Sequence, residues 1–279
     1  MSEALTRITG VMKTKYCMDI SAYDPTFLFK SAEKRILASG VSGIQGYLDY
    51  LSENAAEAET FFDSLHITYS QFFRDPMTFA LLEQFVLPRI VAEKPEGSEV
   101  RVWSAGCAGG QEAYSVAMLI SDMAQYSGID VRYRIIATDI CDVSLSAGRT
   151  GLYDQNAIQE IRDKHLQRYF SKQAGVYTIS QQLRKNVIFS YYDLLDTATS
   201  NPPESIFGDF DIVLCCNLLI YYTSELQQFI VKKLKRAMAK GGYLITGEAE
   251  RSLVEKTSRL KTLSIPSSVF MNHPRSAAI

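Results

Sequence analysis

The sequence predicts a doubly wound, mostly parallel α/β sheet with a small antiparallel insertion, preceded by a small all-α domain. In the first third of the chain, apolar residues recur every three or four positions, which is typical of the buried face of helices. Further along, short runs rich in Val, Ile and Leu alternate with helical segments, as in strands joined by crossover helices. The charged segment 93–97, which contains proline and glycine, separates the two patterns. We therefore expect a helical domain with its linker at residues 1–92 and a second domain at residues 93–279.

The helical domain is expected to contain several short helices from Tyr23 onward. Gly40, Gly43 and Asn54 interrupt the apolar pattern there, because these residue types favour helix ends and turns. A further helix is expected after Pro76. Residues 1–20 have scattered polar and charged residues and no continuous apolar stretch, so we expect no secretory signal and a cytoplasmic protein.

The second domain is expected to alternate strands and helices. The expected strands cover residues 100–104, 133–138, 211–217 and 243–246. The expected helices cover residues 111–125, 143–148 and 226–238, the last one ended by Gly241 and Gly242. Strand-like residues at 176–179 and 186–189 fit the small antiparallel insertion, and residues 269–272 fit an edge strand.

Composition and charge exclude several classes of function. A formal net charge of −2 gives no overall positive field to hold nucleic acid. The five cysteines form no Cys-x-x-Cys pair and the three histidines lie far apart, so we expect reduced thiols and no metal site. The most apolar stretch, residues 210–222, is interrupted by Asp211 and Asn217 and is too short to span a bilayer.

Three predicted strands end in glycine-rich or polar segments, and together these segments suggest a nucleoside site. The first strand runs into residues 104–112, whose glycines let a ligand approach the backbone closely. The second ends in Asp139, whose carboxylate can accept hydrogen bonds from both hydroxyls of a ribose. The third ends in Asn217, at the edge where open α/β sheets bind ligands. Each segment alone could be a tight turn or a helix N-cap, although Asp142 is expected to cap the helix that follows Asp139.

Several ordered motifs extend this pattern over nearly the whole chain. They lie at residues 70–75, 103–115, 137–140, 217–222 and 246–252. In these motifs the sequence resembles the chemoreceptor glutamate methyltransferases, the CheR family, from about residue 23 to residue 272. The resemblance implies a Rossmann-like methyltransferase sheet that binds S-adenosylmethionine and releases S-adenosylhomocysteine. It further implies a cytoplasmic monomer that methylates glutamate carboxylates of a chemoreceptor-like signalling protein and neither binds nucleic acid nor inserts into a membrane.

The resemblance implies a cofactor site of ten residues: Thr68, Ser70, Arg74, Gly106, Glu112, Asp139, Asp193, Leu194, Asn217 and Leu218. Glu112 would pair with the amino group of the methionine part of the cofactor. Asp139 would hold the ribose hydroxyls. Asn217 and Leu218 would touch the cofactor near its adenosine and its sulfur.

The remaining implied roles concern the adenine, the entrance of the site and the reaction. Asp193 and Leu194 would flank the adenine, and the segment 68–74 would close the site. Arg74 and Tyr221 would be catalytic, because Arg74 can grip a carboxylate with its planar guanidinium and Tyr221 would lie near the transferring methyl group. Methyl transfer to a carboxylate is an in-line displacement that needs two positioned reactants and a dry site. A free glutamate titrates near about 4.3, so the nucleophile is already ionised at neutral pH and no general base is needed.

Other interpretations stay open on the sequence alone. Arg74 could form a surface ion pair with Asp75, and Tyr221 could be a core residue. The glycine loop departs from the family pattern at Gly109, Gln111 and Ala113 among others, so a catalytically weak or inactive cofactor-binding signalling module is one alternative. A nicotinamide oxidoreductase uses the same kind of sheet, but the loop spacing is not Gly-x-Gly-x-x-Gly. A nucleic-acid methyltransferase would need a basic surface, whereas the basic residues at 232–236 fit a solvated helix face.

Overall fold

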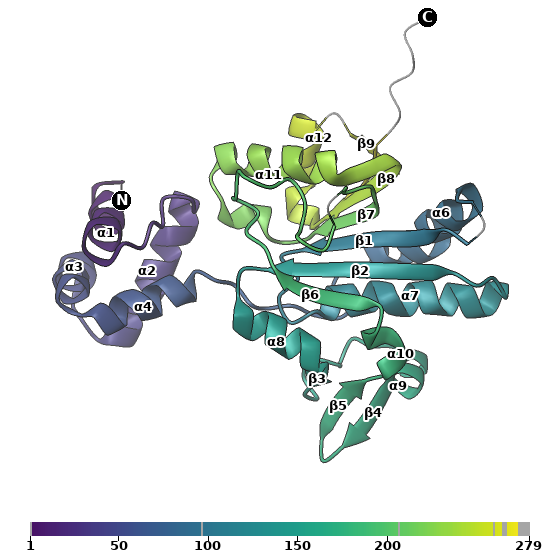
Figure 1. Ribbon diagram of the computed structural model, residues 1–279. Coiled ribbons are helices and arrows are strands. Elements are labelled where there is room, and N and C mark those ends of the chain that lie inside the picture. Colours follow the sequence, from purple (N-terminus) through teal and green to yellow (C-terminus); the bar gives the residue numbers. More distant parts are fainter. Residues whose placement is uncertain (1, 96, 206, 259, 264–266, 273–279) are drawn as a thin grey trace, which may run out of the picture. The chain divides into compact units, whose positions relative to one another are not determined.

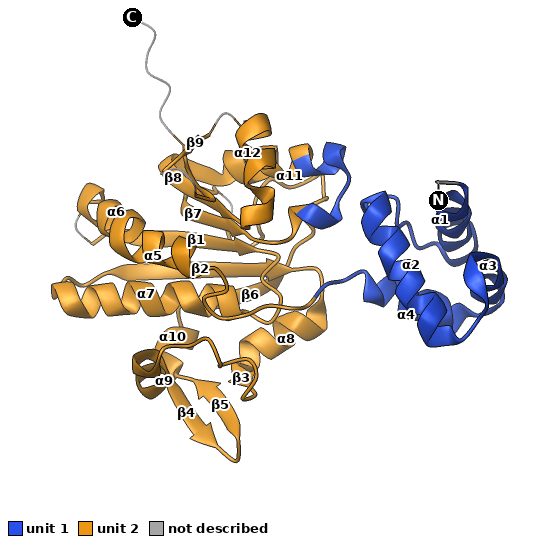
Figure 2. Ribbon diagram, turned by 180° about the vertical axis from the view of Figure 1, so that it is seen from behind, with its two compact units in different colours: residues 1–67, 220–227 blue, residues 68–219, 228–279 orange. Residues whose placement is uncertain are grey.

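The computed structural model describes residues 2–95, 97–205, 207–258, 260–263 and 267–272. The chain divides into two compact units, which Figure 2 shows in different colours. Unit 1 comprises residues 1–67 and 220–227, and unit 2 comprises residues 68–219 and 228–279. The segment 68–92 therefore belongs to unit 2, while the domain boundary expected between residues 92 and 93 stays a prediction.

Unit 1 contains the helices α1 (Ser2–Tyr16), α2 (Pro25–Ser39), α3 (Gly43–Glu53) and α4 (Ala55–Ser64). The Asp24 side chain accepts hydrogen bonds from two N–H groups in the first turn of α2, and Gly40, with a φ of 69°, ends that helix. Asn54 caps α4, so the three predicted interruptions are confirmed. The helix α1 was not predicted. It buries Ile8 and Met12 in the core of the unit with residues of α3 and α4, including Tyr47, Leu51 and Phe61.

Unit 2 is built on a seven-stranded sheet in the order β6-β2-β1-β7-β8-β10-β9. The strands are β1 (Glu99–Ala105), β2 (Arg132–Asp139), β6 (Val187–Tyr191), β7 (Phe210–Cys215), β8 (Met238–Thr246), β9 (Lys261–Thr262) and β10 (Val269–Met271). Five neighbouring strands, β6 to β8 in that order, pair in parallel, and β10 pairs antiparallel with both β8 and β9. The predicted doubly wound, mostly parallel sheet is confirmed.

Helices cover both faces of this sheet, as Figures 1 and 2 show from opposite sides. The longer ones are α5 (Pro76–Leu81), α6 (Leu87–Glu93), α7 (Gln111–Ser127), α8 (Asp142–Thr150), α11 (Ser224–Ala237) and α12 (Arg251–Ser258). A π-helical turn, Leu82–Val86, joins α5 to α6. The helices α6 and α7 lie on one face and α11 lies on the other. The helix α8 shares the face of α7, because the Tyr114 hydroxyl of α7 donates to the Gly148 carbonyl of α8 at 2.9 Å.

A second, three-stranded antiparallel sheet forms the predicted insertion, with the order β3-β5-β4. Its strands are β3 (Leu152–Tyr153), β4 (Phe170–Gln173) and β5 (Val176–Ile179), and the helices α9 (Asp163–Tyr169) and α10 (Gln181–Arg184) adjoin them. The prediction that residues 186–189 belong to this insertion was wrong. They lie in β6, which pairs in parallel with β2 of the main sheet. A short, mostly apolar strand can have the same composition in either sheet. Only its pairing with a distant strand therefore decides which sheet it joins.

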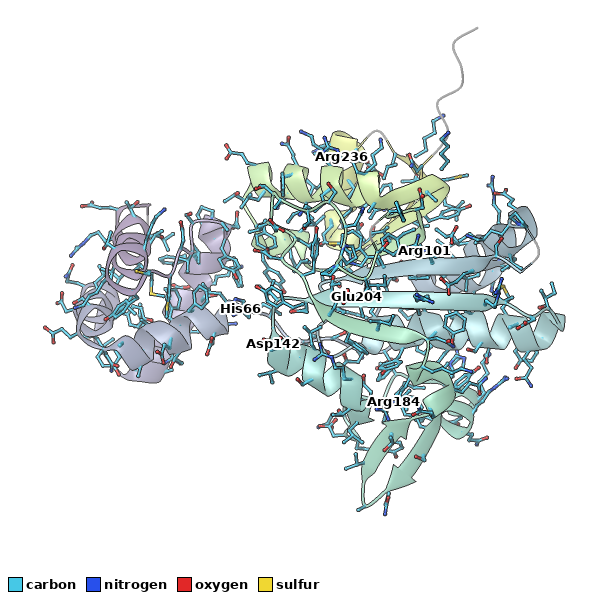
Figure 3. All side chains as sticks on the ribbon, viewed as in Figure 1. His66, Arg101, Asp142, Arg184, Glu204 and Arg236 are labelled. Carbon is cyan, nitrogen blue, oxygen red and sulfur yellow. The ribbon has the colours of Figure 1, made fainter. Side chains whose placement is uncertain are left out.

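Three smaller predictions also differ from the structure. The strand β10 is not at the edge, because the two-residue strand β9 lies outside it. The helix α11 ends at Ala237, before the two glycines, because β8 already begins at Met238. Asp142, labelled in Figure 3, is the first residue of α8, and Cys141 occupies the N-cap position. His273 lies outside the described residues, and among the described helices none is long and apolar enough to cross a bilayer.

Candidate functional site

The glycine loop after β1 lies where the parallel strands end. Gly106 has a φ of 74°, and a Cβ at this position would lie 2.7 Å from a methyl group of Leu218. Both the steric contact and the backbone angle therefore require glycine here. The N–H groups of Gly106 and Cys107 donate to the Thr138 carbonyl at 2.8 and 2.9 Å, which ties the loop to the end of β2. The loop is thus fixed at the strand ends, and at Gly106 no side chain would separate a ligand from the backbone.

Asp139, the last residue of β2, is held from two sides. Its Oδ2 accepts from the Ala108 N–H of the glycine loop at 2.8 Å, and its Oδ1 accepts from the Cys141 N–H at 2.9 Å. Each carboxylate oxygen has two lone pairs, so each can still accept one further hydrogen bond. The side chain is therefore oriented and keeps the capacity to bind a pair of neighbouring hydroxyls.

Glu112 lies in the first turn of α7 and points toward the strand ends. Its Oε1 accepts from the Ser104 hydroxyl at 2.7 Å. Burial raises the pKa of the Glu112 carboxyl, and hydrogen bonds from Ser104 and Cys216 and the charge of Arg74 only partly oppose this. A carboxylate in this position is destabilised by lost hydration, and a bound ammonium group would stabilise it.

A buried carboxylate that the sequence did not single out organises the end of β7. Glu250 is 1% exposed. Its Oε2 accepts from the N–H groups of Asn217 and Gly247 at 2.9 and 2.8 Å, and its Oε1 accepts from the Leu219 N–H at 2.6 Å. These bonds hold Asn217 at a φ of 58°, a backbone angle that is costly for a residue with a side chain. The motif 246–252 contains Glu250, but nothing local indicates that it binds a segment about thirty residues away.

The segment that precedes α5 carries Arg74. Phe72 is fully buried, whereas the Arg74 side chain is exposed and its guanidinium lies 5.4 Å from the centre of the Tyr69 ring. The Asp75 carboxylate accepts from the N–H and the hydroxyl of Thr78 at 3.4 and 2.7 Å. It therefore caps α5, and no ion pair within 4 Å joins it to Arg74 among the described side chains.

A cavity of about 460 Å³ brings three of the predicted site residues together: Arg74, Glu112 and Asn217. Its wall also contains Thr246, whose hydroxyl is buried without a hydrogen-bond partner in the part of the chain that the structure describes. Buried polar groups are normally paired, so a polar ligand at this site would supply the missing partner. The cavity therefore joins a cationic, an anionic and a neutral polar group in one concave space at the strand ends.

The other predicted site residues lie around this centre or in other segments. Leu218 contacts the glycine loop through Gly106. Asp193 and Leu194 follow β6, where the Asp193 carboxylate accepts from the Leu195 N–H at 2.8 Å. Thr68 and Ser70 belong to the chain entering unit 2.

The predicted catalytic Tyr221 belongs to unit 1. Its ring lies 4.8 Å from that of Phe27, and its carbonyl accepts from the Asp24 N–H at 2.8 Å. These contacts account for its packing within unit 1.

The residues of unit 2 fit S-adenosylmethionine. The glycine loop excludes any side chain beside the ligand, Asp139 suits a ribose diol, and Glu112 suits an amino group. Among the described residues, no group of three or more His, Cys, Asp or Glu side chains could hold a metal ion. The arrangement can thus bind an adenosyl amino acid through its sugar and its charged end.

Comparison with known proteins likewise indicates a protein that binds S-adenosylmethionine. A family model described as CheR methyltransferase, SAM binding domain, matches residues 68–269. A chemotaxis protein methyltransferase of Pseudomonas putida is 33% identical over 192 residues, which are 67% of this chain and 67% of that protein. A chemotaxis protein methyltransferase of Borreliella burgdorferi is 24% identical over 89% of this chain and 88% of its own length.

Two further proteins, one compared by sequence and one by structure, resemble this chain over different shares of their lengths. An uncharacterized 104.1 kDa protein of Rhodobacter capsulatus is 32% identical over 94% of this chain, but the chain spans only 27% of that protein. A solved structure of an O-methyltransferase family protein from Burkholderia thailandensis is 15% identical, with a TM-score of 0.39 over 70% of this chain and 42% of that one. The sequence matches therefore identify the chain more sharply than this structural likeness does.

Proposed function

We propose a function from one premise: the chain belongs to the CheR methyltransferase family, whose SAM-binding domain its residues 68–269 match. The chain transfers a methyl group from S-adenosylmethionine to a glutamate carboxylate of a chemoreceptor-like signalling protein. The observation that carries this proposal is the cavity lined by both Arg74 and Glu112 at the strand ends. Glu112 suits the cationic end of the cofactor, and Arg74 suits an anionic methyl acceptor.

The cofactor supplies a methyl group bonded to a positively charged sulfur. Gly106 would let the cofactor approach the backbone, and Asp139 would accept from its ribose hydroxyls. Glu112 would pair with its amino group, and Asn217, held by Glu250, and Leu218 would touch it near its adenosine and its sulfur.

Five further residues complete the proposed site. Asp193 and Leu194 are placed beside the adenine. Thr68 and Ser70 are placed at the entrance, on the segment that leads into unit 2. Tyr221 is placed near the reacting groups, and its test is the same transfer assay that is described below for Arg74.

The chain's own contribution to the reaction is positioning and exclusion of water. The acceptor carboxylate is ionised at neutral pH, so no protein group has to remove a proton. The guanidinium of Arg74 fixes one oxygen of the acceptor and directs the other along the line of displacement. Charge is neutralised as the methyl group moves, so a site that excludes water favours the reaction.

The proposed partner is a methyl-accepting chemoreceptor or a related signalling protein, and the chain is proposed to act as a cytoplasmic monomer. The relatives named as chemotaxis protein methyltransferases support this choice. Nucleic acid is a poor partner, because only two of the four basic residues of α11, Lys232 and Arg236, are exposed. Lys233 is 5% exposed and donates to the Tyr192 hydroxyl at 3.2 Å, and Lys235 donates to the Ser258 carbonyl at 2.6 Å. Arg236, labelled in Figure 3, follows them on the same helix.

The test is Arg74→Lys, which keeps the positive charge and removes the planar guanidinium that can bind a carboxylate in bidentate fashion. We expect single-turnover methyl transfer to a chemoreceptor cytoplasmic fragment to fall at least about tenfold, which corresponds to roughly 1.4 kcal/mol. Cofactor affinity, measured by calorimetry on the same preparation, should change by less than about twofold. Arg89→Lys is the matched control, because Arg89 pairs with Glu93 on the exposed side of α6.

Three outcomes would count against parts of the proposal. Unchanged transfer by Arg74→Lys would make Arg74 a surface residue. A parallel loss of cofactor affinity would mean that Arg74 holds the cofactor instead of the acceptor. Tight cofactor binding by the wild-type protein without any transfer would favour the signalling module that binds the cofactor but does not react.

A further inference from the structure

Phe73, the residue before Arg74, is held in an unfavourable backbone conformation. Its φ is 51°, in the left-handed region that residues with a side chain seldom adopt. Such an angle is energetically unfavourable and persists only where the surroundings enforce it. The Phe73 N–H donates to the Ser115 hydroxyl of α7 at 3.1 Å. That hydroxyl in turn donates to the Gln111 carbonyl at 2.8 Å.

The ring of Phe73 is fixed by a histidine. The imidazole of His165, in α9, stacks on it with a centroid distance of 5.1 Å and an interplanar angle of 14°. Phe79 contacts the same ring edge-on, at 5.2 Å and 70°. The His165 side chain is 1% exposed, so this stack is shielded from water. The two aromatic contacts and the Ser115 bond together determine where the backbone of Arg74 begins.

The imidazole is oriented by a buried carboxylate. The Oδ2 of Asp122 lies 3.1 Å from the His165 Nε2, and its Oδ1 accepts from the Tyr169 hydroxyl at 2.6 Å. Arg168 and Lys164 lie 3.2 and 3.4 Å from the same carboxylate. Burial opposes the charge of Asp122, but these partners outweigh it and lower the pKa of that carboxyl.

The protonation of His165 follows from its surroundings. Burial lowers the pKa of His165, although Asp122 raises it in part, so the imidazole is neutral at neutral pH. Its Nδ1 is buried without a hydrogen-bond partner among the residues that the structure describes. The neutral tautomer with the proton on Nε2 satisfies Asp122 and leaves Nδ1 as an unused acceptor.

We propose that His165, oriented by Asp122, is a positioning residue for methyl transfer: through Phe73 it fixes the backbone from which Arg74 reaches the acceptor carboxylate. The Asp75 cap on α5 holds the other side of Arg74, so the arginine is the one exposed side chain between two fixed neighbours. The inference rests on the proposed role of Arg74. It concerns transfer and leaves cofactor binding unchanged, because neither His165 nor Phe73 lines the cavity that contains Glu112.

The test is a double-mutant cycle between His165→Ala and Arg74→Ala. With a chemoreceptor cytoplasmic fragment as acceptor, His165→Ala should lower kcat about tenfold, with KM and cofactor affinity within about twofold of wild type. In the Arg74→Ala background the same change should lower kcat less than about twofold, because the group it positions is gone. His165→Gln keeps a planar donor at the position of Nε2 and should restore kcat to within about threefold of wild type.

Two further measurements separate positioning from general stability. Tyr169→Phe is the matched control, since it removes one hydrogen bond from Asp122 without touching Phe73; it should lower the melting temperature and leave kcat unchanged. In the free protein, hydrogen exchange of the N–H groups of residues 73–75 should accelerate at least about fivefold in His165→Ala and stay slow in Tyr169→Phe. If His165→Ala does not fold, Phe73→Leu takes the place of that variant in the same double-mutant cycle. This substitution removes the ring stack and keeps an apolar side chain at position 73.

Several results would overturn the inference. They are wild-type kcat in His165→Ala, equal losses in the two Arg74 backgrounds, and a loss in Tyr169→Phe as large as that in His165→Ala. Failure of the proposed function looks different. In that case the wild-type protein transfers no methyl group, or Arg74→Ala transfers as fast as wild type, and the inference fails with it.

Discussion

Glu57 in unit 1 and Glu112 in unit 2 both lie in the first turn of a helix, where Glu57 is buried and Glu112 is half-buried. Glu57 accepts two hydrogen bonds from the Arg35 guanidinium at 2.9 and 2.6 Å and a third from the Tyr47 hydroxyl at 2.9 Å. Glu112 accepts hydrogen bonds from the Ser104 hydroxyl at 2.7 Å and from the Cys216 thiol, and burial raises its pKa. Both sites receive the favourable field of a helix N-terminus, so the difference lies in their partners.

The comparison separates a carboxylate that stabilises the fold from one that is kept for a ligand. The charge of Glu57 is neutralised within its own unit by a bidentate arginine. The carboxylate of Glu112 lines a cavity, and among the described side chains none forms an ion pair with it as Arg35 does with Glu57. The charge of Arg74 lowers the pKa of Glu112 less than its hydrogen bonds do. A protein tolerates such a charge where a ligand completes the site, which is why perturbed carboxyls mark binding sites.

The largest expected effect is loss of folding when unit 2, which contains Glu112, is shortened at its N-terminal end. Leu82, Val86 and Leu87 are fully buried in the core of the sheet, and Ile90 is 6% exposed. Loss of one such side chain costs about 2–5 kcal/mol, and a whole domain is stable by only about 5–15 kcal/mol. A chain of residues 93–279 should therefore fail to fold, whereas residues 68–279 should show a cooperative thermal transition. Equal transitions in the two chains would place the domain boundary after residue 92.

The second expected effect tests the structural role of Glu57. Glu57→Ala leaves Arg35 without its partner and should lower the free energy of unfolding by about 2–3 kcal/mol, at the low end for a buried pair because the Arg35 side chain is 22% exposed. Denaturant unfolding measures this loss, and cofactor affinity should stay within about twofold of wild type. Glu59→Ala, at an exposed position of the same helix, is the control and should change stability by less than about 0.5 kcal/mol. Weaker cofactor binding in Glu57→Ala would break the contrast between the two glutamates.

The third effect tests the binding role of Glu112. Glu112→Gln keeps the shape of the side chain and removes the charge, so S-adenosylmethionine should bind about 2 kcal/mol more weakly, roughly thirtyfold. Calorimetry with the cofactor and with S-adenosylhomocysteine checks this, since both carry the amino group. Glu160→Gln, at an exposed position of the same unit, should bind normally. Normal affinity in Glu112→Gln, with the fold intact, would remove the amino group from this site.

The smallest expected effect is the pH dependence of the free protein. The folded pKa of Glu112 is raised above its ordinary value of 4.5, so the folded state binds more protons than the unfolded state between these two values. The contribution of Glu112 to stability is therefore fully present below pH 4.5 and is lost as the pH rises through the folded pKa. Without cofactor, Glu112→Gln should be at least as stable as wild type at pH 7.5, and the difference should shrink on acidification. A variant that is less stable at pH 7.5 would mean that Glu112 supports the fold as Glu57 does.

The sequence by itself determined the parts of this protein that depend on local order. The alternation of strands and helices predicts a parallel sheet, since side chains repeat every two residues in strands and every 3.6 in helices. Parallel strands end at one edge, so Asp139 and Asn217 are predicted there as well. The glycine loop is predicted for the same reason, because its glycines directly follow the first strand. These features are encoded in short segments and in motifs that resemble a known family.

Only the tertiary structure decided which distant segments became partners. Residues 186–189 joined the main sheet through β2, and the two-residue strand β9 took the edge position next to β10. The pairing partner of such short strands lies far away along the chain, so their own residues do not identify it. Glu250 binds the segment around Asn217, and His165 stacks on Phe73 about ninety residues away. Buried polar groups such as these are positioned by hydrogen-bond partners that lie far away in the sequence. The spacing of residues along the chain does not predict those partners.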